Sequence, residues 1–229
     1  MHGRSLLLAI VVPTAAAACG SGKHPVADAG PAGDAAAPDA ATCPSSLLTG
    51  GTDVAAQGWS VVMQAPAMLS YGLDHVKLQT MPGTTTSGQL LLDHPAAVEM
   101  GKPFKIQVVM LVEAVNPHNP ADAGAAILGS FTPPFGTPAE RNQMIYLDAG
   151  KIGWADDAQS FAVAVTDGAY HTYELAVDAG GNATLSVDGT QALTRTGFAT
   201  NGAIAVGDQT NDKGVDSTLR IRSVTRLCP

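Results

Sequence analysis

A two-residue alternation of apolar and polar side chains is the feature that most restricts how this chain can fold. Between Phe104 and Glu113 every even position is apolar, and most odd positions are polar. Successive side chains of a β-strand point to opposite faces of a sheet, so this stretch predicts a long strand with one buried face. The alternation recurs in residues 160–165, 172–177 and 183–187. No stretch beyond the N-terminal region keeps a helical period, and we therefore expect an all-β domain.

The spacing of the expected strands predicts the architecture. Many short strands bounded by Gly, Pro, Asn and Asp are typical of two antiparallel sheets packed face to face. We predict such a two-sheet sandwich for residues 43–229, with Asp188-Gly189 forming a tight hairpin turn. Besides the segments above, strands are expected at residues 57–64, 75–80, 89–93, 126–131, 143–148, 203–207 and 217–225.

The N-terminus has the composition of an export signal. Arg4 precedes a mostly apolar run over residues 5–17, which is shorter than the roughly 20 residues that span a hydrocarbon core as a helix. Small residues lead from this run to Cys19, and the segment resembles the lipobox of bacterial lipoproteins. The resemblance implies cleavage after residue 18 and a lipid on Cys19 that anchors the chain to a membrane of the bacterial cell envelope. The alternative is an ordinary secretory signal in which Cys19 is incidental.

Residues 19–42 predict a tether between the lipidated cysteine and the domain. They are rich in Ala, Pro, Asp and Gly, and Val26 is their only large aliphatic residue. Such a segment cannot bury enough apolar surface to offset the entropy of ordering, so we expect it to be disordered. Without Arg4 the chain carries 11 Lys and Arg against 20 Asp and Glu, a net charge of −9. This charge argues against nucleic acid as a partner.

One segment is similar to a known superfamily. Tyr170-His171 opens an expected strand, a Val187-Asp188-Gly189 hairpin follows, and Ile204–Gly207 precedes the last strand. This order resembles the laminin-G-like branch of the concanavalin A-like lectin and glucanase superfamily. The resemblance implies a jelly-roll sandwich whose first and last strands are adjacent. In residues 208–214 the chain departs from many of these proteins, which have a Gly-rich segment there, so no loop function is carried over.

Two cysteines bracket the expected domain. If Cys19 is acylated, Cys43 and Cys228 remain, and export to an oxidising compartment favours their pairing. Two free thiols are the alternative. Adjacent terminal strands, as the resemblance implies, would support a Cys43–Cys228 disulfide.

Carboxylate patterns argue against catalysis. Glycosidases of the resembled superfamily typically carry E-x-D-x-E or E-x-D-x-x-E on one strand, which places the carboxylates on one face. No glutamate here has an acid two residues later, and no G-x-S-x-G elbow supports a Ser-His-Asp triad. His171 takes a structural position in the resembled motif. We therefore predict that the domain is not an enzyme. The glutamates are Glu99, Glu113, Glu140 and Glu174.

Two loops carry several oxygen ligands of the kind that Ca²⁺ prefers. Laminin-G-like and pentraxin-like proteins often bind Ca²⁺ at sandwich edges, but neither loop has the spacing of a known calcium motif. Asp and Asn are also common turn residues. No cofactor is therefore predicted, and Ca²⁺ remains an alternative. The first loop holds Asp208, Asn211 and Asp212, and the second holds Asn116, Asn119 and Asp122.

Residues 143–156 predict a hairpin that could bind a ligand. With Ala149-Gly150 as its turn, Tyr146 lies opposite Gly153 and Asp148 lies opposite Lys151. A ring over a glycine leaves its face open for stacking on a sugar, so these four are the predicted ligand-binding residues. The alternative is that Tyr146 only covers backbone. The other face is purely apolar and is expected in the core, with Ile145, Leu147, Ile152 and Trp154.

These patterns together predict an envelope-anchored binding module for a glycan or a protein ligand. A structural or adhesive envelope protein is the alternative, and a glycoside-active enzyme is less well supported.

Overall fold

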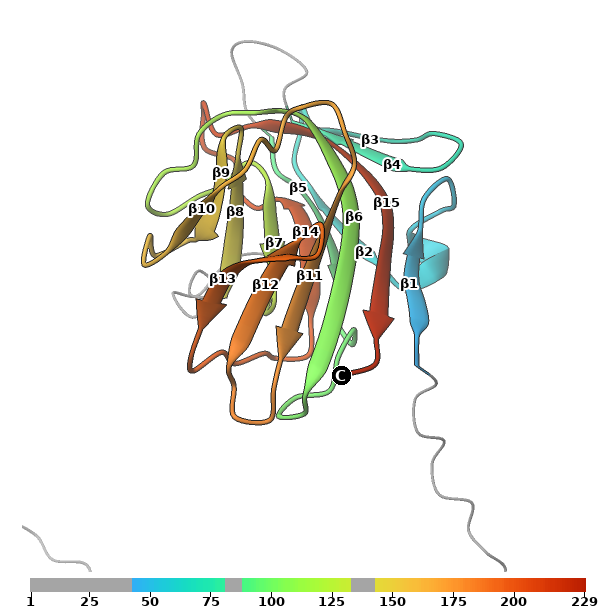
Figure 1. Ribbon diagram of the computed structural model, residues 1–229. Coiled ribbons are helices and arrows are strands. Elements are labelled where there is room, and N and C mark those ends of the chain that lie inside the picture. Colours follow the sequence, from blue (N-terminus) through green and yellow to red (C-terminus); the bar gives the residue numbers. More distant parts are fainter. Residues whose placement is uncertain (1–42, 81–87, 133–142) are drawn as a thin grey trace, which may run out of the picture. The chain divides into compact units, whose positions relative to one another are not determined.

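The computed structural model describes residues 43–80, 88–132 and 143–229. The predicted signal peptide, the lipid site at Cys19 and the tether lie outside these residues. The described chain forms two antiparallel sheets and one short 3-10 helix, η1 (Ala55–Gln57) (Figure 1). The all-β, two-sheet prediction is confirmed. In the described part of the chain, no helix combines the length and apolar character needed to cross a membrane.

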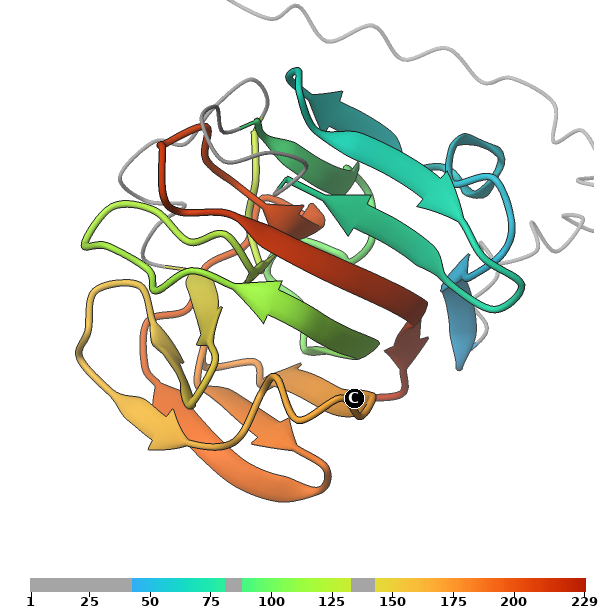
Figure 2. The same cartoon turned by 90° about the horizontal axis from the view of Figure 1, so that it is seen from above.

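The larger sheet is built around a long strand at the C-terminal end of the chain. Strand β15 pairs with β6 on one side, and on its other side with β4 and then β1. Figure 2 shows β15, in red, between β6 in green and the β3–β4 pair in teal. The strands of this sheet are β13 (Thr190–Arg195), β12 (Ala183–Val187), β11 (His171–Val177), β6 (Phe104–Val115), β15 (Ser217–Leu227), β4 (Val76–Gln79), β3 (Met68–Tyr71) and β1 (Ser45–Thr49).

The smaller sheet packs against the larger one and carries the predicted hairpin at one side. Its first four strands, β10, β9, β8 and β7, are consecutive in the chain, whereas β14, β5 and β2 are brought together from distant segments. Their bounds, in sheet order, are β10 (Ser160–Ala162), β9 (Lys151–Trp154), β8 (Met144–Asp148), β7 (Ala126–Leu128), β14 (Ile204–Asp208), β5 (Leu90–His94) and β2 (Ser60–Met63).

The main core fills the space between the two sheets. In β6 buried and half-buried residues alternate, as the sequence pattern predicts. The buried positions each remove an apolar side chain from water, which stabilises the fold by about 1.5–3 kcal/mol per large side chain. They are Phe104, Ile106, Val108, Met110 and Val112. The hairpin contributes its apolar face to the same core, so the inward assignment of Ile145, Leu147, Ile152 and Trp154 is confirmed.

The outer faces of the two sheets differ. On the larger sheet, ion pairs join neighbouring strands, such as Lys77 with Glu113 at 2.9 Å and Lys105 with Glu174 at 3.4 Å. The outer face of the smaller sheet is instead largely apolar at its centre, where every residue of β8 is buried. A second apolar cluster lies there, made of Leu91, Ala123, Ala126, Leu128, Phe131, Met144, Tyr146, Ala155, Ala203 and Ala205.

Candidate functional site

The β8–β9 hairpin has the register that the sequence predicts. Tyr146 pairs with Gly153, and Asp148 pairs with Lys151 across the turn. The absence of a side chain at Gly153 is a requirement of the packing, because a Cβ there would lie 2.4 Å from the Tyr146 hydroxyl oxygen. The hairpin therefore places Tyr146, Asp148 and Lys151 on the outer face of the smaller sheet.

The expectation that the ring of Tyr146 is open to a ligand is wrong. Tyr146 is only 1% exposed, and the imidazole of His118 stacks on it with ring centroids 3.5 Å apart and planes 12° apart. His118 belongs to the segment that follows β6, and this segment folds back over the outer face of the smaller sheet. The small residues on that face, Ala126 and Gly153 among them, leave space for the Tyr146 ring, and the imidazole of His118 covers that ring.

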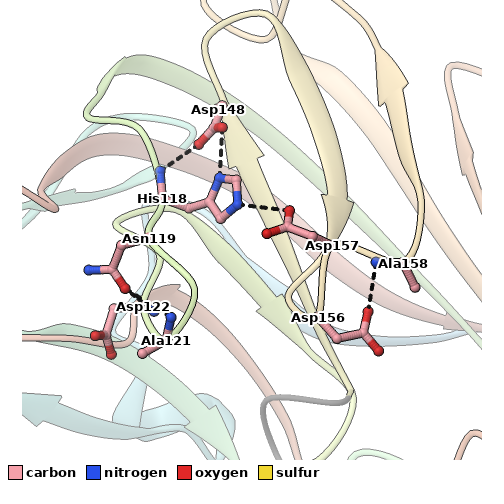
Figure 3. Close-up of polar contacts among 8 residues, drawn as sticks. All are labelled: His118, Asn119, Ala121, Asp122, Asp148, Asp156, Asp157 and Ala158. Carbon is pink, nitrogen blue, oxygen red and sulfur yellow. Dashed lines mark hydrogen bonds and ion pairs between the residues drawn. The ribbon is translucent and has the colours of Figure 1, made fainter.

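His118 joins two carboxylates (Figure 3). Its Nδ1 lies 2.8 Å from Asp148 Oδ2, and its Nε2 lies 3.1 Å from Asp157 Oδ1. Its backbone N–H also donates to Asp148 Oδ1 at 2.8 Å. Asp157 has φ of 55°, a left-handed conformation that non-glycine residues seldom adopt. The side chains of His118 and Asp148 are about nine-tenths buried, so this network fixes the segment after β6 to the hairpin.

Lys151 takes a different position from its cross-strand partner. Both oxygens of Asp148 are engaged by His118, and no ion pair of the described residues involves Lys151. Its ammonium nitrogen instead lies 5.5 Å from the centroid of the Tyr146 ring. Burial raises the pKa of the Tyr146 phenol, and the positive charge of Lys151 offsets part of that rise.

A cavity of about 630 Å³ opens beside this network. Asp148 and Lys151 line it together with His118, while Tyr146 lies beneath the His118 ring. Among the predicted ligand-binding residues, Asp148 and Lys151 thus reach the cavity, whereas Tyr146 and Gly153 form the layer under it. The other lining residues are small or apolar apart from one hydroxyl, namely Pro117, Ala149, Gly150, Ser160 and Ala162.

Sequence reasoning missed His118. Its neighbours Asn116, Asn119 and Asp122 were considered only as possible Ca²⁺ ligands. No periodic signal identifies His118, because it belongs to an irregular segment after a strand and its partners are 30 and 39 residues away. The one local clue is the sequence Asn-Pro-His-Asn-Pro, which cannot continue a strand.

The first loop that offered possible Ca²⁺ ligands, residues 208–212, uses its side chains in contacts with the rest of the protein. Asp208 is 1% exposed and accepts hydrogen bonds from the Thr80 hydroxyl at 2.5 Å and the Thr210 backbone N–H at 3.0 Å. Burial raises its pKa to about 9, so this carboxyl group is neutral at pH 7. Asn211 is exposed and donates to Gln64. Asp208 and Asn211 thus bond to separate groups of the protein.

The second Asx-rich loop also uses its oxygens internally. Asn119 Oδ1 accepts the backbone N–H groups of Ala121 and Asp122, and Asp122 Oδ1 accepts from Gln209. Within residues 43–80, 88–132 and 143–229, no group of three His, Cys, Asp or Glu side chains is placed to hold a metal ion.

His171 is a hydrogen-bonded structural residue, as predicted. It is buried, with Nδ1 2.7 Å from Asp188 Oδ2 and Nε2 3.1 Å from Asp167 Oδ1. Burial lowers the pKa of His171, but the two carboxylates outweigh burial and leave the pKa raised.

A second cavity, of about 510 Å³, is lined by the end of β9, the loop before β10, and residues of β12 and β13. Gln159 Oε1 accepts the Thr194 backbone N–H, and the Arg195 guanidinium pairs with Asp156 and stacks on Trp154. Another Arg195 nitrogen, Nη1, is buried without a hydrogen-bond partner among the described residues. The first cavity, which brings an ammonium, a carboxylate and a hydroxyl together, is the candidate ligand site.

Cys43 and Cys228 are both exposed and are present as thiols. The β1–β15 register pairs Ser45 with Arg226, and two further residues outward it brings Cys43 opposite Cys228. The hydrogen bond that the Cys43 thiol donates to Cys228 is the main cause of a raised pKa at Cys43. The terminal strands are thus adjacent, and the two sulfur atoms are neighbours.

The arrangement of the sheets is shared with several solved structures. The Emp46p carbohydrate recognition domain in its metal-free form is 11% identical over 80% of this chain and 95% of that chain, with a TM-score of 0.53. The VIP36 exoplasmic/lumenal domain in its Ca²⁺/Man3GlcNAc-bound form is 13% identical over 80% and 87%, also with 0.53. The chain shares the two-sheet jelly-roll fold of these structures.

A third similar structure is the carbohydrate esterase vb_24B_21 from Shiga toxin-encoding bacteriophage phi24B. It is 16% identical over 81% of this chain and all of that chain, with a TM-score of 0.51. No protein-family model matches the sequence, and a search of curated proteins finds no match. At these identities the likeness concerns the fold alone.

Proposed function

We propose that this chain displays a non-catalytic glycan-binding module from the bacterial cell envelope, and that the 630 Å³ cavity is its binding site. The observation that carries the proposal is the cavity itself. It combines a carboxylate, an ammonium and a hydroxyl, from Asp148, Lys151 and Ser160, with walls formed by small side chains. The similar folds named as carbohydrate recognition domains support the same reading.

The chemistry of the cavity suits a ligand with many hydroxyl groups. Lysine only donates hydrogen bonds, a carboxylate only accepts them, and a serine hydroxyl does both, so a sugar can satisfy all three. The volume lies within the range of roughly 300–1,000 Å³ that small ligands occupy. The His118 network fixes Asp148 before any ligand arrives, which reduces the entropy cost of binding.

Two of the glutamates do not reach the cavity. Glu113 pairs with Lys77 and Arg220, and Glu174 pairs with Lys105, all on the outer face of the larger sheet. A glycosidase needs two carboxyl groups that act on one sugar bond. The two carboxylates beside the cavity, Asp148 and Asp157, are both bonded to the His118 imidazole, which favours a structural role for them.

Filling the cavity should abolish glycan binding. Ala162 lines the cavity and is exposed, so Ala162→Trp should lower affinity about tenfold or more while leaving stability within about 0.5 kcal/mol. The measurement is a glycan array of residues 19–229 carrying Cys19→Ser, followed by titration of any hit, with Ca²⁺ and with a chelator.

The matched control is Ala56→Trp, which adds the same ring to an exposed site on η1, in the β1–β2 connection. Binding that survives Ala162→Trp unchanged would exclude this cavity. A folded domain that binds no glycan would favour a protein contact instead. Large apolar side chains are exposed on two edge strands and the turn after β3, namely Val61 and Met63 on β2, Met68 and Tyr71 on β3, and Leu73 in the turn.

We also propose that Cys19 anchors the chain. Lipobox processing requires the thiol, so Cys19→Ser should abolish acylation and leave precursor or soluble product. Metabolic labelling with a tagged fatty acid measures this, with Cys43→Ser as the control that should still be labelled. Equal labelling of Cys19→Ser and wild type would refute the lipoprotein assignment.

A further inference from the structure

The charges in the cavity are unevenly paired. Both oxygens of Asp148 accept hydrogen bonds from His118, and Asp157 bonds the other ring nitrogen. Lys151, by contrast, has no carboxylate partner among the described residues, although Asp148 is its cross-strand neighbour. The carboxylates are thus held by the imidazole, whereas the ammonium of Lys151 contacts the Tyr146 side chain and has, in the described part of the chain, no carboxylate partner that would compete with a charged ligand.

The position of Lys151 is constrained. It is half-buried, and its ammonium lies over the buried Tyr146 ring at 5.5 Å from the centroid. Tyr146 is itself held by Gly153 below and His118 above. A lysine placed over a fixed ring loses less side-chain freedom on binding than a lysine in open solvent.

The remaining polar group of the cavity wall is neutral. The Ser160 hydroxyl makes no hydrogen bond with the described residues, and its neighbours on the wall are Ala162, Ala149 and Gly150. A ligand that fits this wall therefore needs hydroxyls for Ser160 and one negative charge for Lys151. A sugar acid has both.

We propose that the cavity selects glycans that carry a carboxylate, and that Lys151 is the residue that pairs with it. This inference rests on the proposed glycan-binding function. Hydrogen bonds to charged groups contribute more than neutral ones, by enough to change affinity about tenfold or more. The interaction is partly exposed and should weaken as salt rises.

The test compares two matched pairs of ligands, the methyl glycosides of galacturonate and galactose and those of glucuronate and glucose. Dissociation constants are measured by titration of the Cys19→Ser chain from residue 19 at low salt. The expected result is that at least one uronate binds about tenfold or more tighter than its neutral parent. Lys151→Gln should remove that preference and leave the affinity for the parent sugar unchanged, and Lys151→Arg should keep it.

Lys102→Gln is the matched control, because it makes the same charge change far from the cavity in the fold. Lys102 lies just before the start of β6, whereas the cavity is lined by residues that follow the end of β6. Equal binding of each uronate and its parent overturns the inference and leaves the glycan-binding function standing. A preference that survives Lys151→Gln overturns the role of Lys151. If no sugar binds to folded protein, both proposals fail.

Discussion

Replacing Trp154 with alanine is expected to lower the free energy of unfolding by about 3–5 kcal/mol. The indole is 1% exposed, lies in the main core, and donates from Nε1 to the Thr194 backbone carbonyl at 3.1 Å. The Arg195 guanidinium also stacks on it, 4.8 Å from the ring centroid. Truncation removes the apolar contacts, leaves a cavity, and leaves the Thr194 carbonyl without its donor. Urea unfolding followed by circular dichroism measures the change.

Leu73→Ala is the control, because Leu73 is fully exposed and its truncation should change stability by at most about 0.5 kcal/mol. Tyr146→Ala should resemble Trp154→Ala rather than Leu73→Ala, since Tyr146 is equally buried and carries the stacked His118. A loss below about 1 kcal/mol for Trp154→Ala would contradict the assignment of this residue to the core.

A disulfide between Cys43 and Cys228, which we propose for the exported protein, is expected to stabilise it by about 5 kcal/mol. This is the chain-entropy estimate for so long a loop, before any strain is subtracted. The thiols are neighbours, and directly opposite residues in antiparallel strands have Cα separations of roughly 4.5–5.5 Å, within the disulfide range. Oxidised protein should therefore unfold at higher urea concentration than the same protein after reduction.

Peptide mapping without reductant should find residues 43 and 228 in one cross-linked pair. The Cys43→Ser, Cys228→Ser double variant is the control, and its stability should not respond to reductant. Free thiols at both positions in exported protein would show that the proposed disulfide does not form.

The strands that follow the two-residue pattern were predictable from sequence. Strands β6, β11 and β12 and the β8–β9 hairpin have the expected faces, because alternation directly reports which side chains are buried. Three strands were not expected, namely β1, β3 and β13. All three lie at the margins of the larger sheet, where partial exposure blurs the contrast between buried and exposed positions.

The candidate site was only half predictable. The hairpin register identified Asp148 and Lys151, because a two-residue turn fixes which side chains face each other. It could not show that Tyr146 is covered, since the covering residue His118 comes from an irregular segment 28 positions earlier. The contact depends on how a loop packs across a sheet, and local periodicity carries no information about it. For the same reason the sequence did not show that Asp208 points inward.

The pairing of β1 with only the last part of β15 has a mechanical consequence. The proposed Cys43–Cys228 disulfide would join the start of β1 to the end of β15, so tension arriving at residue 43 would pass through this bond to β15. Without the bond, the same tension would fall first on the four β1–β15 pairs, whereas β15 is paired with β6 at ten positions. The disulfide would therefore protect the weaker of the two ladders from mechanical load.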